Sequence, residues 1–150
     1  MKIKEIVNKN YKVMELITKD ILKETPAVYG IRKCKGIDLN KEIDYIGSTF
    51  DIHRRWFTDH QKPSMPLMTK IVYDIIGKYY HDYENYMDYF YQAKLLIKDY
   101  ECVIIKDFSY LKPKINNKIA IKNFKSKMTN YEKVLIDHYQ PKFNKQTIVL

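Results

Sequence analysis

Apolar residues recur at helical spacing over the first 25 residues of the chain. Lysines occupy much of the opposite side of such a helix, which makes the segment amphipathic. The apolar positions on one side are Ile3, Ile6, Val7, Met14, Ile17 and Ile21. Pro26 disfavours helical geometry at Thr25 and is expected to end the helix. The pattern predicts an N-terminal helical extension over residues 1–25, packed through its apolar face on a main domain of residues 26–150.

Three short segments have the apolar, β-branched and aromatic character of strands. They are residues 27–31, residues 43–47 and residues 102–108. Gly36, Asp38 and Asn40 lie between the first two segments and indicate a turn. We therefore expect a β-hairpin with a long loop, followed much later in the chain by a third, buried strand.

Three further segments have helical periodicity, namely residues 51–60, residues 67 to about 90 and residues 129–139. Asp51 can cap the first of these helices, and Pro141 is expected to end the last. The polar, lysine-rich stretch 109–127 contains Pro113 and is interpreted as a surface loop. The order of elements predicts an α+β domain, with a small, mostly antiparallel three-stranded sheet flanked by helices.

Tyrosine is unusually dense in the segment between residues 67 and 90. The tyrosines are Tyr73, Tyr79, Tyr80, Tyr83, Tyr86 and Tyr89. Such rings can stack on nucleic-acid bases. Packing in the core, with some rings half exposed, is the simpler interpretation, and the pattern leaves both open.

The chain is basic, with 27 Lys and Arg against 18 Asp and Glu and a net charge of +9 over 150 residues. A basic chain attracts polyanions, because each neutralised phosphate releases a counterion. Lysine-rich proteins without a nucleic-acid role also exist, so charge alone leaves the partner open. Hydrophobic residues make up 45% of the sequence, yet no apolar run approaches the ~20 residues of a membrane span.

Two features bear on the compartment. The N-terminus lacks the apolar stretch of a secretory signal, so we expect a protein inside the cell, in the cytoplasm, in the nucleus or associated with a virus. Cys34 and Cys102, the only cysteines, form no CxxC pair, which argues against a zinc finger or ribbon. Two reduced thiols are the preferred interpretation, and a single disulfide is the alternative.

Several residue groups occur in an order that is typical of one nuclease family. The first predicted strand contains Val28-Tyr29-Gly30-Ile31, and the second contains Tyr45-Ile46-Gly47-Ser48-Thr49. They are followed by the pair Arg54-Arg55, by His60, by Glu132 in the last helix, and by Asn144 after a proline. From residue 27 to about residue 144 the chain resembles the GIY-YIG nucleases of homing, restriction and repair systems.

The resemblance implies a role for each of these residues. Glu132 is expected to hold a single Mg²⁺, with Mn²⁺ as an alternative, because hard cations of this kind take carboxylate oxygen and keep most of their waters. Arg55 is expected to bind the phosphate bidentately. Tyr29 is implied as the proton acceptor from water, and Tyr45 is expected to orient the water or the phosphate. Asn144 is expected to hold the site together by hydrogen bonds.

Three positions depart from the family pattern. Ala27 stands where the first glycine of the family name usually lies, and the 16-residue spacing from Tyr29 to Tyr45 is longer than usual, which lengthens the hairpin loop. His60 lies one residue later than expected relative to Arg55. Its role as a second base, a phosphate contact or a surface residue therefore stays open.

Local patterns also offer simpler interpretations of two site residues. Thr129-x-x-Glu132 fits a capping box, in which Glu132 only stabilises a helix N-terminus. Arg54 and Arg55 can form a solvated helix face, and neighbours on a helix point about 100° apart, so only one of them faces a given site. The 8-residue spacing from Gly47 favours Arg55, and the 12-residue spacing from Glu132 to Asn144 favours a catalytic Glu132.

The sequence therefore predicts a metal-dependent endonuclease that hydrolyses DNA phosphodiester bonds. Arg54, Arg55 and Lys62 are the candidates for phosphate or DNA contacts, together with residues 62–70 and 109–127. One rival is a catalytically silent nucleic-acid-binding module of the same fold, and another is a basic interaction protein unrelated to nucleases. The sequence does not distinguish a restriction, phage-type or structure-specific enzyme, and it leaves the oligomeric state open.

Overall fold

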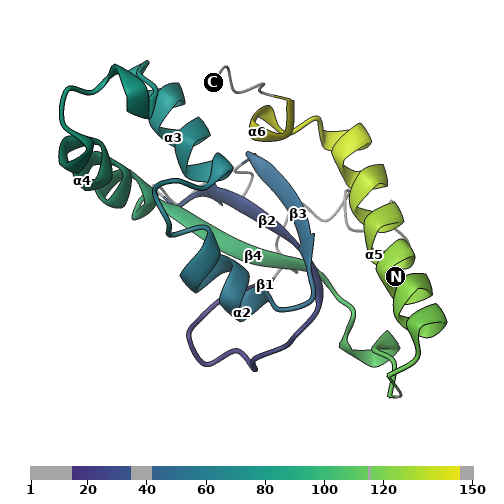
Figure 1. Cartoon of the computed structure of the whole chain (residues 1–150). Helices are drawn as coiled ribbons and strands as arrows, with labels where there is room; N and C mark the ends of the chain where they lie inside the picture. Colours follow the sequence, from purple (N-terminus) through teal and green to yellow (C-terminus); the bar gives the residue numbers. More distant parts are fainter. Residues whose placement is uncertain (1–14, 35–41, 115, 146–150) are drawn as a thin grey trace.

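An antiparallel sheet lies between helices in the computed structural model, which describes residues 15–34, 42–114 and 116–145 (Figure 1). The strands are β1 (Glu15–Leu16), β2 (Ala27–Lys33), β3 (Tyr45–Thr49) and β4 (Tyr100–Asp107). They are arranged in the order β1-β4-β2-β3, and every pair is antiparallel. The predicted α+β class and the three main strands are confirmed, although β3 begins two residues later than expected and β1 adds a short fourth strand.

The predicted helix over residues 1–25 is wrong for the part that the structure describes. Residues 15 and 16 form β1 on the edge of β4, and Ile17 N donates to Cys102 O at 2.9 Å. Turns follow, and no helix is present between residues 15 and 25. The reason is tertiary: the open edge of β4 offers backbone partners to this segment, and Ile17 is buried in the core. Residues 1–14 lie outside the described residues.

The helix predicted over residues 51–60 has two parts, α2 (Ile52–Arg54) and the π-helix η1 (Arg55–Asp59). Asp51 caps it as predicted, since its side chain accepts a hydrogen bond from Arg54 N. The π-helix closes with a bond from His60 N to Arg55 O at 2.8 Å, which spans five residues instead of four. A π turn therefore accommodates one additional residue between Arg55 and His60.

The single helix predicted from residue 67 to about residue 90 is wrong, because the structure divides this segment. Helix α3 (Pro66–Ile76) ends at Gly77, which has φ 82°, a left-handed value that glycine adopts without strain. The short 3₁₀ helix η2 (Tyr80–Asp82) follows. Helix α4 (Tyr86–Ile97) then begins after Asn85, whose side chain accepts a hydrogen bond from Met87 N.

The surface loop predicted over residues 109–127 is also largely wrong. The 3₁₀ helix η3 (Ser109–Leu111) comes first, and α5 (Lys118–Tyr139) begins after Asn117, whose side chain caps Ile119 N and Ala120 N. Glu132 consequently lies well inside a 22-residue helix, so it is not part of an N-terminal capping box. Gln140 takes a left-handed conformation at the end of α5, and α6 (Lys142–Lys145) follows Pro141.

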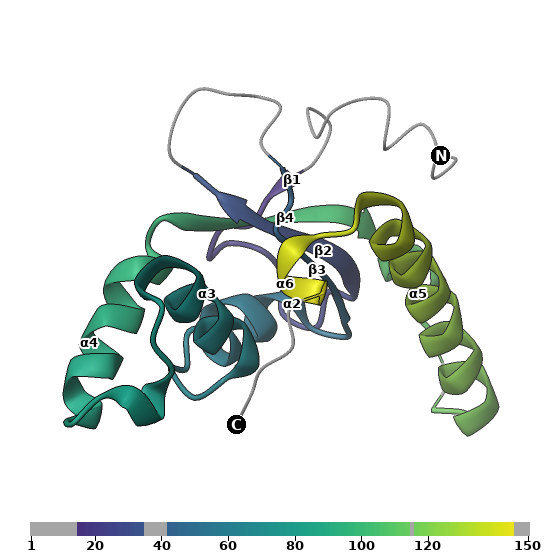
Figure 2. The same cartoon turned by 90° about the horizontal axis from the view of Figure 1, so that it is seen from above.

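The two faces of the sheet carry separate cores. Tyr29 and Ile31 pack with residues of α2 to α4, including Trp56, whereas Val28 and Ile46 pack with residues of α5. Helices α3 and α4 accordingly lie on one side of the strands and α5 on the other, as Figures 1 and 2 show (Figure 1, Figure 2). Strand β3 lies at the outer edge of the sheet and contributes to both cores, since Tyr45 packs against one of them and Ile46 belongs to the other.

No helix within the described residues is both long enough and apolar enough to cross a membrane.

Candidate active site

The candidate site lies along β3, the edge strand of the sheet, which pairs with β2. Tyr29 on β2 lies opposite Gly47 on β3, so its ring covers a residue without a side chain. A Cβ atom built on Gly47 would lie 2.6 Å from the Tyr29 hydroxyl oxygen. Only glycine at position 47 allows the Tyr29 hydroxyl to lie against the backbone of the edge strand.

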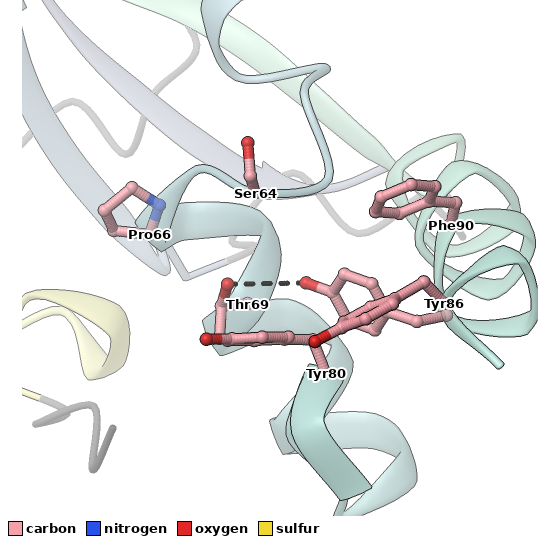
Figure 3. Close-up of a pocket in the computed structure, with 7 residues that line it drawn as sticks. Ser64, Pro66, Thr69, Tyr80, Tyr86 and Phe90 are labelled. Carbon is pink, nitrogen blue, oxygen red and sulfur yellow. Dashed lines mark hydrogen bonds between the residues drawn. The ribbon is translucent and has the colours of Figure 1, made fainter. Parts of the chain in front are cut away.

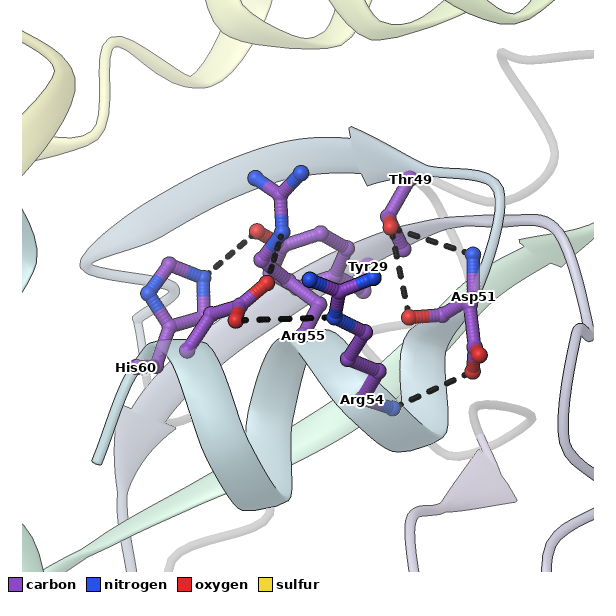
Figure 4. Close-up of polar contacts among 7 residues, drawn as sticks. Tyr29, Thr49, Asp51, Arg54, Arg55 and His60 are labelled. Atoms are coloured by element: carbon purple, nitrogen blue, oxygen red, sulfur yellow. Dashed lines mark hydrogen bonds and ion pairs between the residues drawn. The ribbon is translucent and has the colours of Figure 1, made fainter. Parts of the chain in front are cut away.

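The Tyr29 hydroxyl lies 2.6 Å from Nε2 of His60, and both side chains are buried (Figure 4). In the sequence, His60 lies one residue later relative to Arg55 than in the family pattern. The π-helix η1 between them accommodates this extra residue. The histidine whose role was open is therefore a direct partner of Tyr29. Burial raises the pKa of Tyr29 well above its usual value, and nearby Tyr45 raises it further, while the Arg55 guanidinium opposes the rise.

His60 is neutral at pH 7. Burial, followed by the positive charge of Arg55, lowers its pKa from 6.5 to about 4, and Asp59 partly opposes this. A neutral imidazole has one donor and one acceptor nitrogen, so Nε2 can accept the Tyr29 proton when Nδ1 carries the hydrogen. Nδ1 is buried and has no hydrogen-bond partner within the described residues.

The lowered pKa of His60 predicts how stability depends on pH. Between about pH 6.5 and pH 4 the unfolded chain binds a proton on His60 that the folded protein does not, so the unfolding free energy falls as the pH falls. The loss attributable to His60 is up to about 3 kcal/mol. Urea unfolding at pH 7, 6, 5 and 4 measures it, and His60→Gln is expected to remove that part of the slope.

His81→Gln is the matched control for this measurement. The His81 side chain is 47% exposed and lies outside the site, so the substitution is expected to leave the pH profile as in the wild type. An equal slope in wild type and His60→Gln would contradict a neutral, buried His60.

Arg55 lies near enough to Tyr29 to act on its pKa, whereas no such effect is seen for Arg54. The Nε atoms of both arginines lie near the carboxylate of Asp59, at 3.9 Å for Arg54 and 3.4 Å for Arg55 (Figure 4). The Arg54 side chain is 74% exposed and that of Arg55 is 36% exposed. Arg55 Nε lies 3.4 Å from Asp59 Oδ2 in an ion pair one turn along the π-helix. The positive charge of Arg55 also acts to lower the pKa of Tyr45 and of Glu132, which shows that one guanidinium lies near all of these groups.

Glu132 approaches β3 from α5 and accepts a hydrogen bond from the Ser48 hydroxyl. Burial raises the pKa of the Glu132 carboxyl, while the Ser48 hydrogen bond and then Arg55 oppose the rise. Sequence reasoning did not assign a role to Ser48, although it stands inside the quoted Tyr45–Thr49 segment. Its hydroxyl fixes the carboxylate that the sequence singled out, 84 residues away along the chain.

The donor set near Glu132 suits a lightly coordinated hard cation. One carboxylate lies in a partly buried position with a hydroxyl beside it, and no group of three or more His, Cys, Asp or Glu side chains within the described residues could enclose a metal ion. Mg²⁺ is commonly held by one or two carboxylates while it keeps several waters. The residues present therefore fit Mg²⁺ better than zinc, which requires a closed set of nitrogen or sulfur ligands.

Tyr45 completes the ring of aromatic side chains around the site. Its ring centroid is 6.1 Å from that of Tyr29 and 5.7 Å from that of His60. Burial raises the pKa of Tyr45, and the charge of Glu132 raises it further. Both tyrosines are thus neutral hydrogen-bonding groups at pH 7.

Asn144 braces the edge strand from α6. Its Nδ2 donates to Ile46 O and its Oδ1 accepts from Ile46 N, both at 2.8 Å. These two bonds occupy the N–H and C=O groups of Ile46 on the edge strand, as another strand would. Asn144 therefore acts on the geometry of the strand that carries Tyr45 and Ser48.

Asn144→Ala is expected to lower the free energy of unfolding by about 1–3 kcal/mol, because it removes two hydrogen bonds and leaves the Ile46 backbone groups without their partners. Thermal or urea unfolding measures the change. Lys145→Ala, at the exposed neighbouring position, is the control and is expected to stay within about 0.5 kcal/mol of the wild type. Equal stability of the two variants would show that the Asn144 bonds do not hold the strand.

The remaining sequence-predicted residues lie at the margin. Arg54 and Lys62 are exposed, Lys62 on the turn that follows His60. Both are accessible for contacts with a large anion, and neither takes part in the Tyr29–His60 or Ser48–Glu132 pairs.

Cys34 and Cys102 are free cysteines, and Cys102 is buried on the core side of β4. The preferred interpretation of two unlinked thiols therefore agrees with the structure.

Tyr29, Tyr45, Arg55, His60 and Glu132 thus come from four separate parts of the chain and meet at the outer edge of the sheet. Comparison of the chain with protein-family models gives no match, and comparison with curated proteins and with solved structures gives no significant similarity.

Proposed function

We propose that this protein is a DNA endonuclease of the GIY-YIG type, which hydrolyses phosphodiester bonds with one divalent metal ion. The observation that carries the proposal is the convergence at β3 of a tyrosine–histidine pair, an arginine and a single carboxylate. Hydrolysis of a phosphodiester needs an activated water, stabilisation of phosphate charge and assistance to the leaving oxygen. The set contains one residue type suited to each of these needs.

Arg55 is the group suited to the phosphate. Its guanidinium is always charged and matches two phosphate oxygens at once. The side chain is 36% exposed, and its ion pair with Asp59 is made by Nε, so the two terminal amino groups are the donors suited to an incoming anion. Arg55 is thereby poised to hold the phosphate beside the Tyr29 hydroxyl.

Tyr29 and His60 are suited to receive a proton from water. A buried phenolate is costly, as the raised pKa of Tyr29 indicates. If the Tyr29 proton moves to Nε2 of neutral His60 while Tyr29 accepts one from the water, no free phenolate has to form. The 2.6 Å separation of the two side chains permits this transfer, and the lowered pKa of His60 opposes it.

Glu132 is the residue suited to hold Mg²⁺ or Mn²⁺, with Ser48 keeping the carboxylate in place. When bound, the ion supplies Lewis-acid stabilisation of the phosphate and of the leaving 3′ oxygen.

Supercoiled plasmid incubated with the protein and Mg²⁺ or Mn²⁺ tests the proposal. The wild type is expected to nick or linearise the plasmid, and EDTA is expected to stop the reaction. Tyr29→Phe keeps the buried ring and removes only the hydroxyl, so it is expected to bind DNA and not to cut. Absence of cutting by the wild type on plasmid, branched and single-stranded DNA would refute the nuclease proposal.

A catalytically silent nucleic-acid-binding module is the second candidate. The pKa of Tyr29, which burial raises well above its usual value, favours it, since a proton acceptor works in the deprotonated form. Binding of DNA at low salt, without cutting of any of these substrates, is the result that this candidate predicts.

A further inference from the structure

A hollow lies outside the candidate active site, between the beginning of α3, η2 and α4. Its volume is about 660 Å³, within the range of small-molecule sites. The residues that line it are Ser64, Pro66, Thr69, Tyr80, Tyr86, Tyr89 and Phe90. Figure 3 shows Pro66 and Thr69 on one side of this hollow and Tyr86 and Phe90 on the other (Figure 3). We name it the tyrosine cavity.

The lining selects for an uncharged, flat group. No lining residue carries a charge, and four of the seven are aromatic. The rings of Tyr80 and Tyr86 lie 5.9 Å apart at an angle of 26°, and Tyr86 remains 56% exposed. Exposed rings beside a cavity offer faces for stacking.

The deep side of the cavity is rigid. The Tyr89 hydroxyl donates to Pro63 O at 2.7 Å and lies 3.3 Å from the Thr69 hydroxyl, so α3, α4 and the segment before them are fixed to one another. Tyr89 is 1% exposed. The cavity is therefore formed before any ligand arrives, which lowers the entropy cost of binding.

The chain links this cavity directly to the candidate active site. Ser64 follows His60 by four residues, a span of at most roughly 14 Å of extended chain. Lys62, which is exposed, lies between them. A strand whose phosphate lies at Arg55 and Tyr29 would thus meet a cation and then an aromatic, uncharged cavity within a few nucleotides.

We propose that the tyrosine cavity binds an unstacked nucleobase of the DNA strand that the active site holds. This inference rests on the proposed nuclease function and adds a base-binding site to it. Proteins bind splayed bases by stacking them on aromatic side chains and by hydrogen bonds to the base edges. The cavity presents both kinds of group, since Tyr80 and Tyr86 also carry hydroxyls.

Binding of a single-stranded oligonucleotide that contains 2-aminopurine, measured in EDTA to prevent cutting, tests the proposal. Stacking of 2-aminopurine on the wild type is expected to quench its fluorescence. Tyr86→Ala is expected to abolish the quenching and to weaken binding about 5- to 150-fold, the range for loss of one stacking contact. If Tyr86→Ala does not fold, Phe90→Ala replaces it in the experiment. It removes another lining ring and is likewise expected to reduce the quenching and to weaken binding.

Tyr91→Ala is the matched control, because Tyr91 is on the same helix, is 66% exposed and does not line the cavity. It is expected to bind and quench like the wild type. An otherwise identical strand with an abasic position in place of 2-aminopurine is expected to bind wild type and Tyr86→Ala equally.

The outcomes separate this inference from the proposed function. If the wild type cuts DNA and Tyr86→Ala and Phe90→Ala bind the probe like Tyr91→Ala, the base-binding site is refuted and the nuclease stands. If the wild type binds no DNA at low salt, both are refuted. If a leucine- and proline-rich peptide binds the wild type and not Tyr86→Ala, while strand binding is equal in both, the cavity is a peptide site and the proposal is wrong.

Discussion

Glu132→Gln is expected to reduce DNA cleavage in Mg²⁺ by about 1,000-fold or more, with DNA binding retained in EDTA. Glutamine keeps the shape of the side chain and still offers an oxygen to the Ser48 hydroxyl, so the local structure should persist. It lacks the negative charge that a hard cation requires, and loss of the cation removes several kcal/mol of stabilisation from the transition state. Single-turnover cleavage of plasmid or a labelled duplex measures the effect.

Asp137→Asn is the control for Glu132→Gln. Asp137 is also on α5, five residues further along, and its side chain is exposed. The same change from carboxylate to amide is expected to leave cleavage as in the wild type. If Glu132→Gln cut as fast as Asp137→Asn at every Mg²⁺ concentration, Glu132 would not be the metal ligand.

Arg55→Ala is expected to lower the rate of cleavage at saturating protein by about 100- to 1,000-fold, the range seen when one donor to developing charge is removed. Arg55 lies beside the Tyr29 hydroxyl, where the phosphate is proposed to bind. Arg55→Lys is expected to recover only part of the rate, because an ammonium group cannot grip two phosphate oxygens. Rates at saturating protein separate this effect from weaker binding.

The neighbouring substitution Arg54→Ala provides the comparison. The Arg54 side chain is 74% exposed, which suits it to a contact with a backbone phosphate at the margin of the site. Arg54→Ala is expected to weaken DNA binding and to reduce the slope of log binding constant against log salt concentration by about one, as for the loss of one phosphate contact. The cleavage rate at saturating protein is expected to stay unchanged. The reverse result, with Arg54 controlling the rate, would mean that the 8-residue spacing from Gly47 selected the wrong arginine.

Local sequence patterns determined the strands and the candidates they carry. Tyr29 and Tyr45 lie in segments whose β-branched and aromatic residues favour strands, and these strands pair as expected. The cap at Asp51 and the end of α5 before Pro141 also follow from neighbouring residues. Such features are predictable because the responsible interactions span only a few positions along the chain.

Helix boundaries were less predictable where tertiary packing holds the helix. The first turns of α5 are rich in exposed lysines, which resemble a loop, yet Phe124 and Met128 pack in one cluster with Val28 and Ile46, and the helix begins at Lys118. In the opposite direction, residues 15–17 have a helical pattern but pair with the open edge of β4. In both cases the deciding partner is distant in sequence.

The sequence by itself determined which residue types the site contains, whereas the tertiary structure decided how they act together. The Ser48–Glu132 hydrogen bond joins residues 84 positions apart, and the Asn144 bonds to Ile46 join residues 98 positions apart. His60 reaches Tyr29 because a π turn accommodates one additional residue, and Tyr29 finds room because Gly47 lies across the sheet. These contacts depend on strand pairing and on helix packing from both faces of β3, which no local pattern encodes.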